Sequence, residues 1–219
     1  MNHLPRARLT PLLVVLAIAA MSGCAPEGGG QASGSSSASP NATTTPVTTA
    51  TLQVAREGIT LLGSDGSTLQ TLSYATDPVD AIAALTNRLG AAPATESFAA
   101  NACSYAQKTA SWGHGFSLTY VTDDPGGAAK TFTVRSDAAT ISGNVSVETA
   151  QGFSVGDPVK ALIAKTPNAV TQGEDDPSAF GIRVFFDLDS DQNGVGVDSD
   201  PKTLLISIIF APANVNQDC

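Results

Sequence analysis

Residues 189–200 carry oxygen ligands at the spacing of a calcium-binding loop. In the stretch FDLDSDQNGVGVDSDPK (186–202), the first, third, fifth and twelfth places of an EF-hand loop are filled by Asp189, Asp191, Asn193 and Asp200. Val195 stands where such a loop supplies a backbone carbonyl. Calcium takes six to eight oxygen ligands. The spacing therefore makes calcium a candidate ligand, and no other cofactor is expected.

An acidic turn explains the same residues without a metal. The flanking runs GIRVFFDL (181–188) and TLLISIIF (203–210) are typical of apolar strands, whereas an EF-hand loop lies between helices. A hairpin between apolar strands needs a soluble tip, and Asp, Asn, Ser and Gly favour turns through local hydrogen bonds and backbone freedom. We therefore favour a solvated acidic hairpin tip, with a calcium-stabilised hairpin as the alternative.

One motif points to hydrolase chemistry, but its partners are in the wrong order. GFSVG (152–156) matches a nucleophile elbow centred on Ser154. A hydrolase of that chain order needs a histidine after the serine, and both histidines, His3 and His114, precede it. We interpret Ser154 as part of a glycine-rich approach to a helix, His114 as an exposed turn residue and Trp112 as a packing residue. The protein is not expected to be an enzyme.

The N-terminal residues are typical of an export signal. MNHLPRAR contains Arg6 and Arg8 and no acidic residue, and an uninterrupted apolar run follows from Leu12 to Met21. That run is too short to span a bilayer, because a membrane-spanning helix needs about 20 residues. Residues 1–23 are therefore predicted to be a signal peptide rather than a membrane anchor.

The signal ends in MSGC, which resembles the lipobox of bacterial lipoproteins, with Met21 where leucine is most common. In that family the cysteine, here Cys24, becomes the mature N-terminus, its thiol receives a diacylglyceryl group and its amine is acylated, with palmitate as the expected chain. Two or more acyl chains anchor a protein stably in a membrane. The resemblance implies a lipoprotein held by its lipid anchor on the outer face of the cytoplasmic membrane.

The cysteine count agrees with this assignment. The chain has three cysteines, and lipidation of Cys24 leaves Cys103 and Cys219. These two can form a disulfide bond in the oxidising environment outside the membrane. In the chain-entropy model, a bond that closes so long a loop stabilises the fold by on the order of 4 kcal/mol.

Residues 24–50 are predicted to be a lipidated cysteine followed by a disordered Gly/Ser/Thr/Pro linker. The segment contains one charged residue and almost no apolar side chain larger than alanine, so it cannot bury enough surface to fold. A flexible chain of this length reaches roughly 30 Å. Loss of Arg6 and Arg8 with the signal peptide changes the formal net charge from −9 to −11. Such a negative chain argues against nucleic acid as a partner.

An internal repeat dominates the rest of the chain. TDPVDAIAALTNRLG (76–90) aligns with GDPVKALIAKTPNA (156–169). In each copy an aspartate can cap a helix that begins at a proline. These pairs are Asp77 with Pro78 and Asp157 with Pro158. We expect the first helix to end at Gly90 and the second near Pro167.

Strand-like runs flank both predicted helices. They are 58–63, 68–74, 105–112, 115–122, 130–136, 144–150, 181–188 and 203–210. In the last two runs, alternation predicts two apolar faces, formed by Ile182, Val184, Phe186 and Leu188 and by Leu204, Ile206, Ile208 and Phe210. The predicted fold class is α+β. It consists of two tandem repeats, 51–150 and 151–219, each with one short helix packed on an antiparallel β-sheet.

The helix after GDPV and strands with WGxGxSLTY-type spacing (112–120) resemble the tandem modules of actinobacterial cell-envelope lipoproteins. These are similar in architecture to β-lactamase inhibitory protein and to SmpA/OmlA-like lipoproteins. The resemblance implies a non-catalytic binding or structural module with an envelope protein as partner. β-Lactamase inhibition does not carry over, because the cysteine number differs and aromatic residues are sparse. The alternatives are a solute-capturing lipoprotein that serves a transporter, an inhibitor-like protein-binding module and an unrecognised hydrolase.

Overall fold

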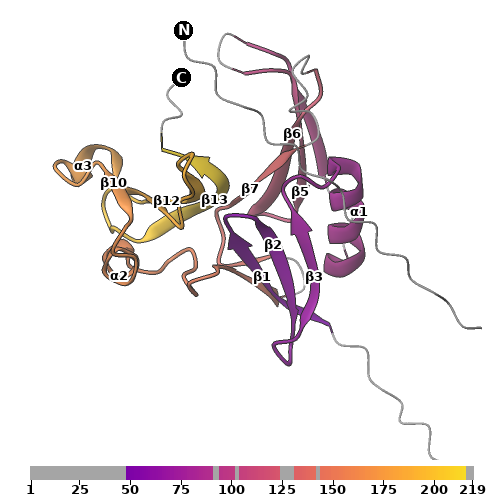
Figure 1. Cartoon of the computed structure of the whole chain (residues 1–219), viewed down its shortest axis with the longest axis horizontal. Coiled ribbons are helices and arrows are strands. Elements are labelled where there is room, and N and C mark those ends of the chain that lie inside the picture. Colours follow the sequence, from indigo (N-terminus) through magenta and orange to yellow (C-terminus); the bar gives the residue numbers. More distant parts are fainter. Residues whose placement is uncertain (1–47, 91–93, 102–103, 124–130, 142–143, 216–219) are drawn as a thin grey trace, which may run out of the picture. The chain divides into compact units, whose positions relative to one another are not determined.

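Strands are the commonest regular elements of the fold. The computed structural model describes residues 48–90, 94–101, 104–123, 131–141 and 144–215 (Figure 1). The strands are β1 (Thr49–Ala55), β2 (Gly58–Gly63), β3 (Thr68–Ser73), β4 (Ala94–Phe98), β5 (Gln107–Trp112), β6 (Phe116–Val121), β7 (Phe132–Ser136), β8 (Thr140–Ile141), β9 (Val145–Thr149), β10 (Val170–Gln172), β11 (Arg183–Phe186), β12 (Asn193–Ser199) and β13 (Ile206–Asn214). The helices are α1 (Pro78–Leu89), α2 (Val159–Lys165) and the short α3 (Pro177–Phe180). The α+β class is therefore confirmed.

The first strands build a five-stranded sheet with the order β3-β2-β1-β9-β8. β1, β2 and β3 follow one another as antiparallel neighbours, which Figure 1 shows side by side. β1 also pairs with β9 in parallel, with Leu52 opposite Val147. The prediction of purely antiparallel sheets is therefore wrong at this pair.

The other strands form an eight-stranded sheet with the order β10-β11-β12-β13-β7-β6-β5-β4. Its two halves meet where β13 pairs with β7, with Phe210 opposite Arg135. Strands from before and after residue 150 thus share one sheet. Two separate tandem helix-on-sheet repeats are not confirmed, because long-range pairing joins strands that the predicted repeats would keep apart.

Helix α1 has the predicted ends. The Asp77 carboxylate accepts a hydrogen bond of 2.9 Å from the backbone N–H of Val79, and Pro78 is the first helical residue. Gly90 ends the helix in the left-handed conformation, with φ 69°. Apolar residues at helical spacing, including Ala81 and Leu85, face the core. Local capping signals therefore determined this element correctly.

Helix α2 begins differently from its predicted counterpart. Pro158 is its N-cap rather than its first residue, and no side chain caps the helix. The Asp157 carboxylate instead accepts a hydrogen bond of 2.8 Å from the backbone N–H of Ser154. The backbone carbonyl of Asp157 accepts from Ile206 at the start of β13. The predicted Asp157 cap is therefore wrong, because this segment is held by β13 and by its own turn. The helix ends at Lys165 with Thr166 as its C-cap, beside the predicted Pro167.

A single apolar core joins the two sheets with α1 and α2. It contains Leu52 and Leu61 from the five-stranded sheet, Leu85 from α1 and Leu162 from α2, all fully buried. Trp112 of β5 is also fully buried, and its ring lies 5.8 Å from the ring of Phe116 between centroids. The interpretation of Trp112 as a packing residue is confirmed.

The apolar face predicted for β11 forms, whereas the one predicted for β13 does not. Ile182, Val184 and Phe186 are buried, and Leu188 is half-buried. On β13 the register shifts after Ile206, because Ser199 pairs with Ile206 while Asp198 pairs with Ile208. The inserted residue turns the following side chains over. As a result the core receives Ile206, Ile209, Ala211 and Ala213, whereas Leu204, Ile208 and Phe210 are half-buried.

The described residues belong to one compact unit. Within them, no helix combines the length and apolar character needed to cross a membrane. Cys24, Cys103 and Cys219 lie outside the described residues, as do residues 1–23 and nearly all of 24–50. Lipidation, the disulfide bond and the domain boundaries therefore stay predictions.

Candidate functional site

The structure does not bring the five calcium candidates together. Asp189 and Asp191 lie in the connection between β11 and β12, whereas Asp200 follows the last residue of β12. Seven residues of extended β12, Asn193–Ser199, separate the two groups, a span of roughly 20 Å at the usual rise per residue. Val195 is buried within β12 and pairs with Phe186. An EF-hand loop must curl around one ion, and a strand cannot. The segment is likewise not the single acidic hairpin tip favoured from the sequence, because residues 193–199 within it form the strand β12.

Asp189 and Asp200 instead organise the turns in which they lie. The Asp189 carboxylate accepts backbone hydrogen bonds of 2.9 Å from Asp191 and Asn193, and the bond from Asn193 is the main cause that lowers its pKa below the ordinary value. The Asp200 carboxylate accepts from the backbone of Lys202 and Thr203, and the Thr203 bond similarly lowers the pKa of Asp200. In the described part of the chain, no three His, Cys, Asp or Glu residues are grouped so that they could hold a metal ion.

Replacing Asp189 with alanine should lower the urea midpoint at neutral pH. The folded-state pKa of Asp189 is lowered, so its stabilising effect is complete above the unfolded-state value of about 3.9 and is lost as the pH falls through the folded-state pKa. The difference from wild type should therefore shrink as the pH falls below the unfolded-state value and disappear once the folded-state carboxylate is protonated as well. Asp191→Ala is the matched control, because that side chain accepts no hydrogen bond among the described residues. A loss for Asp189→Ala that persists at the acidic end would contradict this account.

The residues of the hydrolase-like motif have structural contacts. The Ser154 hydroxyl donates a hydrogen bond of 2.9 Å to the backbone carbonyl of Val147, and its backbone N–H donates to Asp157. His114 is exposed in the turn between β5 and β6, as expected.

The outer face of the eight-stranded sheet presents a continuous row of residues. Cross-strand partners run from β10 to β4 in the order Val170, Phe185, Gly196, Phe210, Arg135, Ser117, Ser111 and Ala94. This is the face opposite to Val184, Val197 and Ile209, which enter the core. Because cross-strand partners point to the same side of a sheet, the row defines one surface built from distant parts of the chain.

Three neighbouring surface hollows on this face share lining residues, and together we call them the sheet groove. The first, of about 490 Å³, lies over β10–β13 and shares Arg183 and Asp198 with the second, of about 330 Å³. The second shares Ser117 and Arg135 with the third, of about 270 Å³, at the β5–β6 turn. At 4.7–4.9 Å between neighbouring strands, the sheet groove spans about 30 Å from β10 to β5. It suits an extended ligand that crosses the strands.

An ion pair lies between the first two hollows. The Arg183 guanidinium donates to both carboxylate oxygens of Asp198, at 2.6 Å from Nε and 3.0 Å from Nη2. The two residues are cross-strand partners on β11 and β12. The hydrogen bond to Asp198 raises the pKa of Arg183 further above its ordinary value. This ion pair holds the Arg183 guanidinium in place, and the Asp198 carboxylate balances its positive charge.

A phenylalanine ring lies in the middle of the sheet groove. Gly196 stands opposite Phe210, and a Cβ atom at Gly196 would lie 2.3 Å from the ring, so the missing side chain makes room for it. The ring meets Phe185 edge-on at 6.3 Å between centroids, and the Arg183 guanidinium lies 5.7 Å from its centroid. Phe210 is half-buried. Its ring therefore has a defined position while part of it stays accessible.

Arg135 is a cation of the sheet groove whose charge is not balanced by an ion pair with another described residue. It is exposed on β7, opposite Phe210 on one side and Ser117 on the other. Among the described residues its side chain has no ion pair and no hydrogen bond. Around it lie the hydroxyl groups of Ser117, Thr119 and Thr133. A solvated positive charge near hydroxyls can bind an anionic group without first breaking an internal bond.

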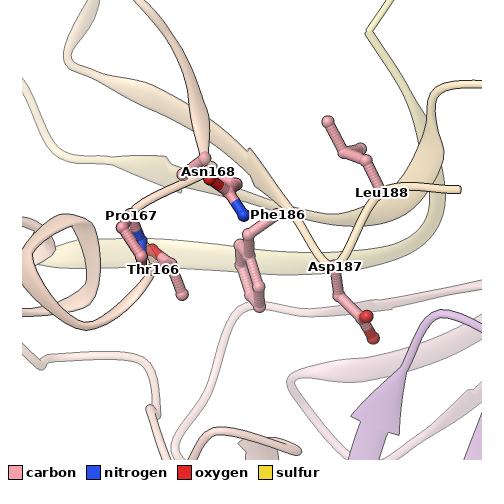
Figure 2. A pocket seen from close by; sticks show the side chains of 7 residues that line it. Thr166, Pro167, Asn168, Phe186, Asp187 and Leu188 are labelled. Carbon is pink, nitrogen blue, oxygen red and sulfur yellow. The ribbon is translucent and has the colours of Figure 1, made fainter.

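Another hollow, of about 310 Å³, lies between the segment after α2 and the end of β11. Figure 2 shows Phe186 between Thr166 and Asp187, while Asp187 and Leu188 point in different directions. The Asp187 carboxylate lies 3.6 Å from Nη1 of Arg56, in the connection between β1 and β2. The one ionisable side chain of this hollow is thus already paired, and the sheet groove is the stronger candidate.

Sequence reasoning did not find the sheet groove. The predicted strand-like runs include Arg135, Arg183 and Phe210. Alternation also places the side chain of Arg135 on the other face of its strand from that of Val134. The missing information is which strands are neighbours. The pairing of β7 with β13 joins residues that are far apart in sequence, and no local sequence pattern predicts this pairing.

Comparison with protein-family models, with curated proteins and with solved structures gives no significant match to this chain.

Proposed function

We propose that the protein is a lipoprotein, exported and anchored through Cys24 to the outer face of an actinobacterial cytoplasmic membrane, whose folded part is a non-catalytic binding module of the cell envelope. The sheet groove is the observation that carries the binding role. It comprises three neighbouring hollows on one sheet face, with an accessible aromatic ring and the Arg135 guanidinium, which has no ion pair among the described residues. Such a surface recognises an extended partner by side-chain contacts.

The anchor has a direct test in cells. A full chain grown with an alkyne fatty acid should become labelled and sediment with membranes, because two or more acyl chains bind a membrane stably. Cys24→Ala should remove the label. An unlabelled wild-type protein released into the medium would refute the anchor. Cys103→Ala serves as the cysteine control and should keep the label.

The binding role can be tested in the same cells. A photo-crosslinking amino acid at Ser117, inside the sheet groove, should give a light-dependent adduct with an envelope component. The same amino acid at Thr71, exposed on β3 of the other sheet, should give none. Equal adducts at both positions, or none at Ser117, would contradict a binding role for the sheet groove.

A further inference from the structure

The sheet groove must recognise its ligand through side chains. Its strands are paired on both sides from β11 to β5, so their backbone N–H and C=O groups are occupied in the ladders. A peptide strand therefore cannot add to the sheet here by backbone pairing, as it does at a sheet edge. The ligand must instead match the chemistry of the exposed side chains.

The exposed side chains offer mainly hydroxyl and amide groups. The middle hollow is lined by Ser117, Thr119, Thr133 and Gln107, and the Thr119 hydroxyl also lies 2.8 Å from that of Thr109. Hydroxyl and amide groups both donate and accept hydrogen bonds. They are complementary to a ligand that carries many hydroxyls of its own.

The ring of Phe210 adds an apolar platform among these polar groups. Contacts with Gly196, Phe185 and Arg183 fix its position. An aromatic ring surrounded by hydrogen-bonding groups can pack against the C–H face of a sugar ring while the hydroxyls at the sugar's rim are bound. Amphipathic ligands of this type need one apolar surface and several polar partners at once.

The charges of the sheet groove and of the whole chain favour a ligand in which carboxylate groups are widely spaced. Among the residues that the structure describes, Arg135 has no ion pair, whereas Arg183 pairs with Asp198. Asp137 lies at the far end, beside His114 in the third hollow. The chain as a whole has a formal net charge of −9, so a ligand with a charge on every unit would be repelled elsewhere. A carboxylate near Arg135 gains a charge-assisted hydrogen bond.

We propose that the sheet groove binds an acidic oligosaccharide in which only some of the sugars carry a carboxylate. Arg135 binds a carboxylate, Phe210 packs against a neighbouring sugar ring, and the hydroxyls of β6 and β7 bind the sugar's hydroxyl groups. This assignment rests on the proposed binding function and specifies the chemical class of its ligand.

Titration of the full chain in detergent with defined probes tests this assignment. A hyaluronan hexasaccharide, in which glucuronate alternates with N-acetylglucosamine, should bind in a salt-sensitive manner. Arg135→Ala should weaken binding about tenfold or more, as expected for a lost charge-assisted hydrogen bond. The carboxyl-reduced hexasaccharide should bind wild type and Arg135→Ala equally, because the group that distinguishes them is absent. Phe210→Ala should weaken binding of both forms.

Matched controls separate this assignment from its alternatives. Lys160→Ala removes an exposed cation from α2, outside the sheet groove, and should leave binding unchanged. Hexaglutamate carries carboxylates without sugars and should bind much more weakly. Equal binding of hexaglutamate, which would favour an acidic protein partner, or equal loss in Arg135→Ala and Lys160→Ala would overturn the assignment.

A complete lack of sugar binding would also overturn it. In that case a light-dependent adduct at Ser117 in cells would leave the proposed binding function standing, because that experiment does not depend on the chemical class of the ligand. Arg135→Gln, which keeps the length and polarity of an exposed side chain, guards against a folding defect in the alanine variant and should show the same loss.

Discussion

Replacing Trp112 with alanine should lower the free energy of unfolding by about 3–5 kcal/mol, the usual loss for a large core aromatic. Trp112 is fully buried on β5 and packs against Phe116. Truncation leaves a cavity that the surrounding strands, fixed by their ladders, cannot fill. Urea denaturation of the wild type and the variant at equal pH measures the difference.

Trp112→Phe is the informative control. The indole N–H of Trp112 has no hydrogen-bond partner among the described residues, and a buried donor without a partner costs about 1–3 kcal/mol. Phenylalanine fills most of the volume and removes that donor, so its loss should be clearly smaller than that of alanine. Equal losses for the two variants would mean that the indole N–H has a partner or that packing is not the main contribution.

Replacing Gly196 with alanine should lower the free energy of unfolding by about 1–3 kcal/mol, as overpacking does. The added Cβ would lie 2.3–2.4 Å from two atoms of the Phe210 ring. Either the ring must leave its position or β12 must move. The same displacement should weaken binding in the sheet groove, since Phe210 is the proposed sugar platform. Urea denaturation and hexasaccharide titration measure the two effects.

A double-mutant cycle tests the cause of this loss. In a Phe210→Ala background, Gly196→Ala should cost much less, because the clashing ring is absent. If the cost is unchanged, the glycine is required for a reason other than the ring, and the fixed position of Phe210 loses its explanation.

Local signals predicted the elements that depend on local chemistry. Asp77, Pro78 and Gly90 define the ends of α1 through capping and backbone geometry, and all three act as expected. The runs that became β5, β6, β7 and β9 show apolar alternation, and burial follows it. For these elements, the residues that predict the helix or strand lie within it or next to its ends.

The failures have a different physical origin. β12 was missed because Gly194 and Gly196 lower strand propensity and resemble turn residues, yet the strand forms between two apolar neighbours. Close contacts explain both glycines. Gly194 lies against the backbone of Phe186, and Gly196 lies against the Phe210 ring. Asp157 failed as a cap because β13 holds its backbone. In each case long-range pairing prevailed over local preference.

The sheet groove could not be predicted for the same reason. Arg135 looks like any solvated residue on an alternating strand, and Phe210 was assigned to an apolar face. The register shift after Ile206 moves that ring to the outer surface, where it meets Arg183 and faces Arg135 across the strand pair. One inserted residue in β13 thus moves Phe210 from the predicted apolar face into the lining of the proposed binding surface.

The central position of β1 matters when the protein is pulled. A force on the chain before Thr49 acts on a strand that lies between β2 and β9 rather than at a sheet edge. An edge strand peels away one hydrogen bond at a time, whereas tension along β1 must shear the ladders on both sides together. A module tethered to a membrane at its N-terminal end and attached to the envelope through its other sheet would carry such tension. For a module tethered in this way, the topology would give mechanical resistance at the point where the chain enters β1.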